Sequence, residues 1–115
     1  MSKIISPEEF LGFAPGTDRK LADWPQIVEY FQKVADASDR VKVDVLGDTT
    51  EGNPFIRAIV TSKGNMSRLE EIRKTHMRIC DPAGLTPEEE GKLVAEGKTI
   101  VLITCSIHST EIAAS

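Results

Sequence analysis

The sequence predicts an α/β fold that combines an antiparallel hairpin, a buried strand and helices packed on the sheet. Three observations lead to this prediction. Valines alternate with charged residues ahead of a run of turn formers, apolar residues recur at helical spacing in two segments, and an almost continuously apolar run lies near the C-terminus. The first pattern is typical of a half-buried strand, the second of an amphipathic helix, and the third of a strand buried on both faces.

Helices are predicted in the first third of the chain. Ser6-Pro7-Glu8-Glu9 is a capping box with proline at the first helical position, so a short helix should follow and end near Gly12. Residues 13–21 form an irregular stretch with proline and glycine, after which Asp23 caps a longer helix, with Gln26 three residues on. The apolar positions of this helix form one stripe that should pack on a sheet: Trp24, Ile27, Val28, Phe31, Val34 and Ala35.

An antiparallel hairpin is predicted in the middle of the chain. Residues 40–46 carry the alternating valines, residues 47–54 are rich in turn formers, and residues 55–61 form a second strand. We expect one face of this hairpin to lie against the long helix before it.

Two further helices should follow the hairpin. One opens at Asn65 and runs to about Ile79, with His76 on its apolar side, where a packed or rim histidine is expected rather than a zinc ligand. The other begins after the capping box Thr86-Pro87-Glu88-Glu89 and is closed by Gly97 as a C′ residue.

Residues 99–105 (Thr-Ile-Val-Leu-Ile-Thr-Cys) are predicted to form the strand buried on both faces. Cys105 should then be a buried thiol, whereas Cys80, after a helix, could be either buried or exposed. These two cysteines lack CxxC spacing, so they suggest neither a disulfide framework nor a metal site.

The composition bounds the class of protein. The chain has 115 residues, 40% of them hydrophobic and 28% charged, and a net charge of −4, which are ordinary values for one small globular domain. No basic stripe suggests a nucleic-acid partner, and no apolar stretch has the length that a membrane span requires. A soluble protein is therefore expected. The N-terminus has no signal-peptide core, which is uninformative about export if a mature sequence has been given a new start.

His108 and Glu111 are the candidate metal ligands. Zinc binds imidazole nitrogen and carboxylate oxygen at about 2.0–2.2 Å, and a spacing of three residues places both side chains on one side of a helical turn. His108 falls just past the predicted buried strand, where open α/β sheets bind ligands. The alternative is a solvated histidine at the start of a helix, with Glu111 favoured there by the helix dipole.

The order of these elements resembles the N-terminal part of a zinc metallocarboxypeptidase of the carboxypeptidase A-like family. The resemblance rests on the turn at 47–54, the helix opening at Asn65, the apolar strand and His108-x-x-Glu111, and it covers the chain from about Phe13 to Ser115. The segment from Gly16 to Trp24 also resembles bacterial-type members with an N-terminal extension. The resemblance to the family divides the chain into an N-terminal extension, residues 1–22, and an incomplete N-terminal portion of the catalytic domain, residues 23–115.

The resemblance implies a three-layer α/β/α sandwich around a mixed sheet, a peptide substrate and a Zn²⁺ cofactor. His108 and Glu111 would be the first two zinc ligands. In the family, a third ligand, a general-base Glu and the substrate-binding arginines and tyrosine come from later positions, so no catalytic residue is assigned within residues 1–115. This chain alone is expected to be inactive, and the strand that lacks its neighbours should favour self-association through an exposed edge.

One departure from the family pattern, at Thr110, affects the predicted substrate, and Ser109 favours the peptidases over a related branch. Familiar members often carry Arg where this chain has Thr110, so their substrate preference does not carry over. The related deacylases that act on N-acyl groups usually have Gly directly after the His, where this chain has Ser109. A zinc amidase or deacylase of the same fold, a family member that has lost its chemistry, and a non-catalytic α/β binding module remain alternatives. The family resemblance also makes a secreted or periplasmic parent plausible.

Overall fold

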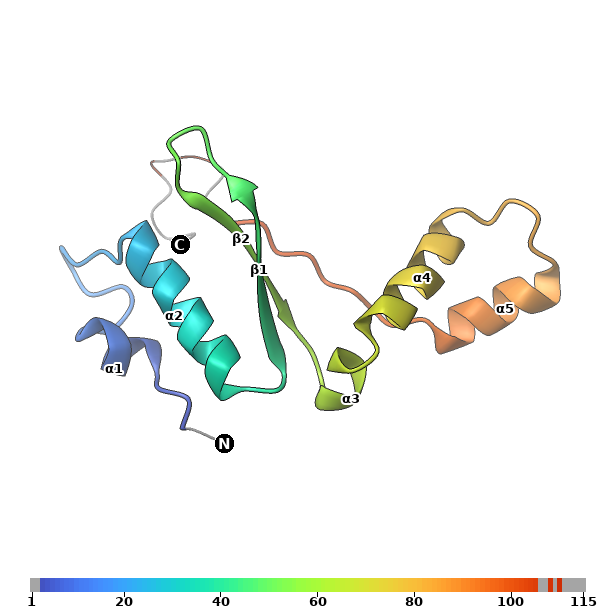
Figure 1. Cartoon of the computed structure of the whole chain (residues 1–115), viewed down its shortest axis with the longest axis horizontal. Coiled ribbons are helices and arrows are strands. Elements are labelled where there is room, and N and C mark those ends of the chain that lie inside the picture. Colours follow the sequence, from blue (N-terminus) through green and yellow to red (C-terminus); the bar gives the residue numbers. More distant parts are fainter. Residues whose placement is uncertain (1–2, 106–107, 109, 111–115) are drawn as a thin grey trace. The chain divides into compact units, whose positions relative to one another are not determined.

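The computed structural model describes residues 3–105, 108 and 110, and the mixture of helices with an antiparallel sheet confirms the α/β class (Figure 1). The elements are α1 (Pro7–Leu11), α2 (Trp24–Ala37), β1 (Val41–Asp48), β2 (Pro54–Val60), α3 (Lys63–Met66), α4 (Leu69–Cys80) and α5 (Pro87–Glu96). The chain divides into two compact units, one formed by Met1–Thr61 with Thr104–Ser115 and the other by Ser62–Ile103. Within the described residues, the sheet consists of β1 and β2.

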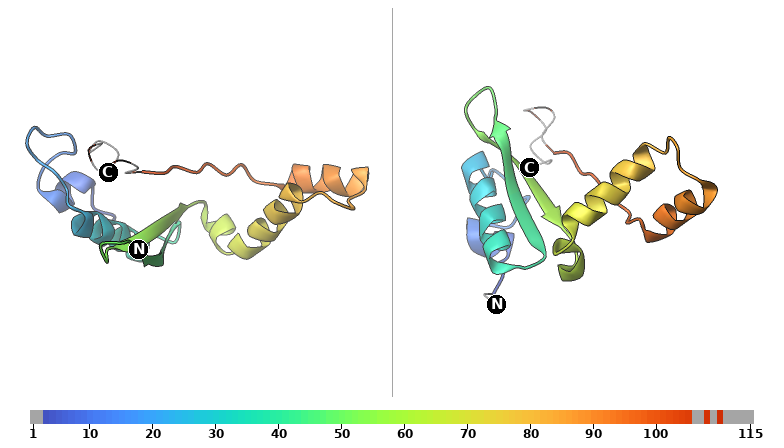
Figure 2. Two further views of the ribbon diagram at one scale, coloured as in Figure 1. Left: turned by 90° about the horizontal axis from the view of Figure 1, so that it is seen from above. Right: turned by 45° about the vertical axis from the view of Figure 1, so that its right-hand side comes forward.

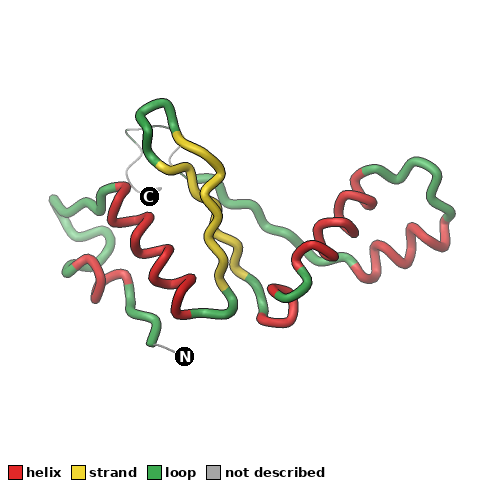
Figure 3. Tube along the Cα trace, viewed as in Figure 1, coloured by secondary structure: helices red, strands yellow, loops and turns green. Residues whose placement is uncertain are grey.

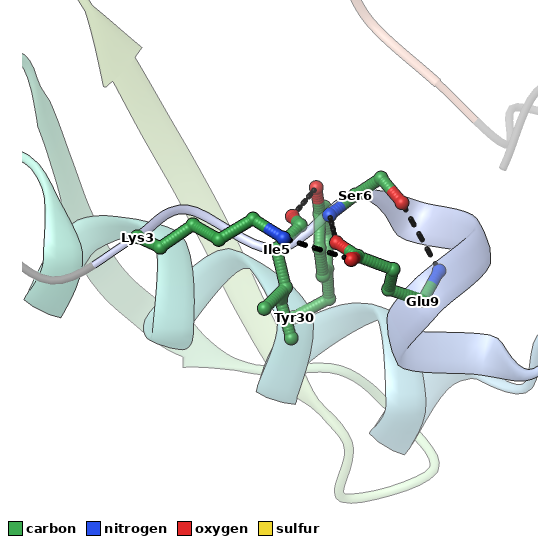
Figure 4. A network of polar contacts seen from close by, with 5 residues as sticks. All are labelled: Lys3, Ile5, Ser6, Glu9 and Tyr30. Atoms are coloured by element: carbon green, nitrogen blue, oxygen red, sulfur yellow. Dashed lines mark hydrogen bonds and ion pairs between the residues drawn. The ribbon is translucent and has the colours of Figure 1, made fainter.

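The short helix α1 begins at the predicted capping box (Figure 4). The backbone N–H of Glu9 donates to Ser6 Oγ at 3.1 Å, and the backbone N–H of Ser6 donates to Glu9 Oε2 at 2.9 Å. This backbone N–H and the nearby Lys3 ammonium hold the pKa of Glu9 below its ordinary value. The helix ends as expected at Gly12, whose φ of 77° is left-handed and suits glycine.

Helix α2 connects the N-terminal segment to the hairpin. Its predicted capping box is present, since Asp23 Oδ1 accepts from the backbone N–H of Gln26 at 2.9 Å. Tyr30 donates from its hydroxyl to the Ile5 carbonyl at 3.1 Å (Figure 4), and the helix packs against both strands (Figure 2). At its start, Trp24 Nε1–H donates to the Pro54 carbonyl at 3.0 Å. The long helix therefore lies against the hairpin, as the sequence predicts.

The predicted hairpin forms, with shifted ends. β1 extends to Asp48, so the connecting loop is shorter than the predicted turn, and a bulge lies between Val45 and Gly47, where Gly47 has a φ of 151°. The register pairs Val43 with Ala58 on a half-buried face. Val45 departs from the predicted alternation, because it is 63% exposed.

The other face of the hairpin carries a charge cluster. Asp44 lies opposite Arg57 in the register and is bonded both to it, at 2.7 Å, and to the Lys42 ammonium, at 2.8 Å. These bonds, first the one to Lys42, hold the pKa of Asp44 below its ordinary value. The two faces of the hairpin are thus chemically distinct, which fixes the side available to α2.

We predict that Trp24 is a principal stabilising contact of the first unit. Trp24→Ala removes a half-buried ring and the hydrogen bond to Pro54, and should lower the free energy of unfolding by about 2–3 kcal/mol. Trp24→Phe keeps a ring and loses the donor, and should cost about 1 kcal/mol. Urea unfolding followed by circular dichroism measures both values. Equal stability of the wild type and Trp24→Ala would contradict the prediction.

The prediction of a single helix from Asn65 to about Ile79 is wrong, because the structure contains two helices there, α3 and α4. Ser62 caps α3, with its Oγ accepting from the backbone N–H of Asn65 at 3.3 Å, so Asn65 lies inside α3. Ser67 Oγ donates to the Gly64 carbonyl at 3.0 Å, and Arg68 adopts φ −131° and ψ 29°. This local side-chain bond and the non-helical residue after it interrupt the helix before α4 begins.

Helix α5 has the predicted start, and its end differs in conformation from the prediction. Thr86 Oγ1 accepts from the backbone N–H of Glu89 at 3.3 Å, and the backbone N–H of Thr86 lowers the pKa of Glu89. Gly97 follows the last helical residue with a φ of −57°, so the expected left-handed C′ glycine is absent at this position. A Cβ there would lie 3.1 Å from the Leu93 carbonyl oxygen and 3.2 Å from Ile79 Cδ1, so both the last turn of α5 and the side of α4 leave little room for a side chain.

The predicted buried strand at 99–105 is wrong for this chain. The segment runs as a loop without strand structure (Figure 3), its residues are exposed, and within the described part of the chain its backbone forms no hydrogen bond. Its four central residues, Ile100 to Ile103, are 63–84% exposed. Cys105 is consequently exposed rather than buried, and Cys80 is exposed too. A buried strand needs neighbours on both edges and layers on both faces, and no described residue is fully buried.

Candidate metal site

His108 lies at a backbone bend a few residues after the exposed apolar segment. The residue is itself exposed, so its imidazole is accessible from solvent. Thr110, where familiar carboxypeptidases often carry arginine, lies in an exposed turn. Glu111 falls outside the described residues, and so does Ser109. The predicted geometry of the His108–Glu111 pair therefore remains a prediction from its spacing.

A metal-bound histidine needs an acceptor for its second ring nitrogen, because that bond fixes the tautomer and the ring orientation. The sequence offers Thr104, Ser106 or a backbone carbonyl for this role. Thr104 is exposed, and Ser106 lies outside the described residues.

His76, the other histidine, is engaged in a structural contact. It is half-buried on α4, and its Nε2 accepts a hydrogen bond from the backbone N–H of Lys98 at 3.2 Å. A nitrogen that accepts this bond is not offering its lone pair to a metal. The prediction that His76 is a packed or rim histidine is confirmed. Its partner was not foreseen, because the distance between α4 and the end of α5 depends on the connection between them.

The donor chemistry of the candidate pair fits zinc, which binds imidazole nitrogen together with carboxylate oxygen. The structure places one of these two donors. Over residues 3–105, 108 and 110, no group of three or more His, Cys, Asp or Glu side chains gathers to hold a metal. Catalytic zinc usually has three protein ligands, so Glu111 and one further ligand would be needed beside His108.

Comparison of the chain with protein-family models, curated proteins and solved structures gives no match. The carboxypeptidase resemblance accordingly rests on the residues quoted above. A separate finding concerns membranes: none of the helices in the described residues combines the length and the apolar character needed to cross one.

Proposed function

We propose that this chain is the N-terminal part of the catalytic domain of a zinc-dependent metallocarboxypeptidase, which hydrolyses a peptide bond near a free C-terminal carboxylate. The observation that carries the proposal is the placement of His108-x-x-Glu111 directly after the apolar segment 99–105. Exposure of His108 supports it, because a ligand of a catalytic metal must face a space that substrate can enter. The capped helix α2 against an antiparallel hairpin also agrees with the expected order of elements.

The exposed apolar segment supports a larger fold around this chain. Burying a Val, Leu or Ile side chain contributes about 1.5–3 kcal/mol relative to leaving it exposed. Four such residues in a row, from Ile100 to Ile103, lie open to solvent in the chain by itself. We propose that in the whole protein residues 99–105 form a strand inside a mixed sheet with helices on both faces.

The two ligands have defined roles in this proposal. Zinc, when bound, supplies a Lewis acid that polarises the scissile carbonyl and lowers the pKa of a water molecule. His108 binds as a neutral imidazole and donates its other ring N–H to an acceptor in the protein. Glu111 binds as an ionised carboxylate and is a ligand, not the general base. The chain by itself should bind zinc weakly and should not hydrolyse peptides.

The proposal is tested on the protein isolated from its natural source. We expect an intact mass well above 12.6 kDa, one zinc ion per chain, and release of C-terminal residues that stops on chelation and returns with added zinc. A C-terminally amidated peptide is the matched control and should resist cleavage. A mass near 12.6 kDa with no zinc would overturn the proposal, and release of acyl groups from N-acyl amino acids in place of peptide cleavage would establish the deacylase alternative.

A further inference from the structure

The second unit, Ser62–Ile103, holds a hydrogen bond between segments distant in sequence. Helices α4 and α5 pack together (Figure 2), and at the end of α5 a Cβ on Gly97 would lie 3.2 Å from Ile79 Cδ1 of α4. The next residue, Lys98, donates its backbone N–H to His76 Nε2 at 3.2 Å, across 22 positions of sequence. This bond holds the residue that follows α5 against the side of α4.

The bond constrains the protonation state of His76. Nε2 accepts a hydrogen bond, so it carries no proton of its own, and the neutral ring must hold its proton on Nδ1. A protonated imidazole has two N–H donors and no acceptor. It would therefore turn an N–H toward the N–H of Lys98, and the hydrogen bond between α4 and the α5 end would be lost.

The charged side chains around His76 balance one another, so they favour neither the neutral nor the protonated imidazole. His76 lines a hollow of about 320 Å³, to which α4 contributes Arg68 and Glu71 and the end of α5 contributes Glu96 and Lys98. These are two cations and two carboxylates, and α3, which also packs on α4, adds no charged residue to this lining. Glu71 is already paired with Arg68 at 3.5 Å. The hydrogen bond to Lys98 is therefore the contact through which protonation would act.

We propose that His76 makes the α4–α5 helix pair a pH-sensitive device, closed when the imidazole is neutral and released when it is protonated. The closed arrangement requires the unprotonated ring, so its stability is present at high pH and is lost as the pH falls. Histidine is the side chain whose ordinary charge change falls between about pH 5 and 8, so the test spans that interval. The inference concerns the second unit and does not depend on the proposed zinc chemistry.

Amide hydrogen exchange of the full 115-residue chain tests this inference. The protection factor of the Lys98 amide, corrected for the intrinsic rate at each pH, should be severalfold lower at about pH 5.5 than at about pH 8. The Leu93 amide lies inside α5 and serves as an internal reference for the helix itself. A Lys98 protection factor that is equal at the two pH values would overturn the proposal.

Substitutions at the two histidines test whether the pH dependence of Lys98 protection comes from the His76 imidazole. His76→Gln keeps a neutral acceptor that does not titrate, and should give Lys98 protection that no longer depends on pH. His76→Ala removes the acceptor and should give low protection throughout. The chain has only two histidines, so His108→Gln is the matched control and should retain the wild-type pH dependence. The same pH-dependent fall in His76→Gln, or its loss in His108→Gln, would refute the assignment to His76.

Discussion

His108→Ala in the full-length protein is expected to abolish stoichiometric zinc binding and to lower the rate of peptide hydrolysis by about a thousandfold. The estimate follows from the several kcal/mol of transition-state stabilisation that a catalytic metal supplies, since each 1.36 kcal/mol or so corresponds to a factor of ten in rate. Zinc content by elemental analysis and kcat/KM on a peptide with a free carboxylate measure the two effects. Retention of both zinc and activity would exclude His108 as a ligand.

Glu111→Gln separates a ligand from a general base. Replacing a ligating carboxylate by an amide should lower zinc affinity, so activity should fall in proportion to bound metal and recover in part at high zinc concentration. Loss of activity at full zinc occupancy would instead indicate a role in proton transfer and would contradict the assignment.

His76→Ala is the matched control for His108→Ala, because Nε2 of His76 is bonded to the Lys98 backbone. It should keep its zinc.

The second large effect concerns the isolated chain, which we expect to self-associate through residues 99–105. The segment is apolar and β-branched, carries no charge or proline, and within the described residues has an unpaired backbone. These are the features of an unprotected strand edge. Sedimentation of the purified chain should show concentration-dependent species well above 12.6 kDa. A single 12.6 kDa species at all concentrations would contradict the prediction.

Charge placed within the segment should restore the monomer. Successive side chains of a strand point to opposite faces, so the double variant Val101→Lys with Leu102→Lys protects both faces. We expect its association constant to fall at least about tenfold, since each lysine both removes apolar burial and adds repulsion between copies. Val94→Lys, at a 64% exposed valine of α5, adds one of these two charges outside the segment and should leave association unchanged. An equal effect of Val94→Lys would indicate a response to net charge alone.

The elements that the sequence predicts correctly are those specified by neighbouring residues. Ser6 with Glu9, Asp23 with Gln26, and Thr86 with Glu89 each place an oxygen acceptor three residues from its partner, which is sufficient to start a helix. The hairpin follows for a similar reason, because alternation and turn residues act within one short stretch. Its bulge was missed, since a bulge depends on the register of both strands.

The errors occur where distant residues decide the outcome. Residues 99–105 have the composition of a buried strand, but a strand forms only when other strands pair with it, and the described residues supply none. The break between α3 and α4 is a local exception, since it follows from the Ser67 hydroxyl bonding to the Gly64 carbonyl and from the non-helical conformation of Arg68. The His108–Glu111 spacing is visible in the sequence, but whether a third ligand meets it is a question of tertiary structure.

The position of Trp24 also determines what optical methods can observe in this protein. Trp24 is the only tryptophan, and the only tyrosine, Tyr30, lies on the same helix of the first unit. Indole emission should therefore follow the α2–hairpin contact through the bond to Pro54 and should not respond to melting of α4 and α5. Far-ultraviolet circular dichroism records helices from both units. The separation between the two unfolding curves would thus measure how far the units melt independently.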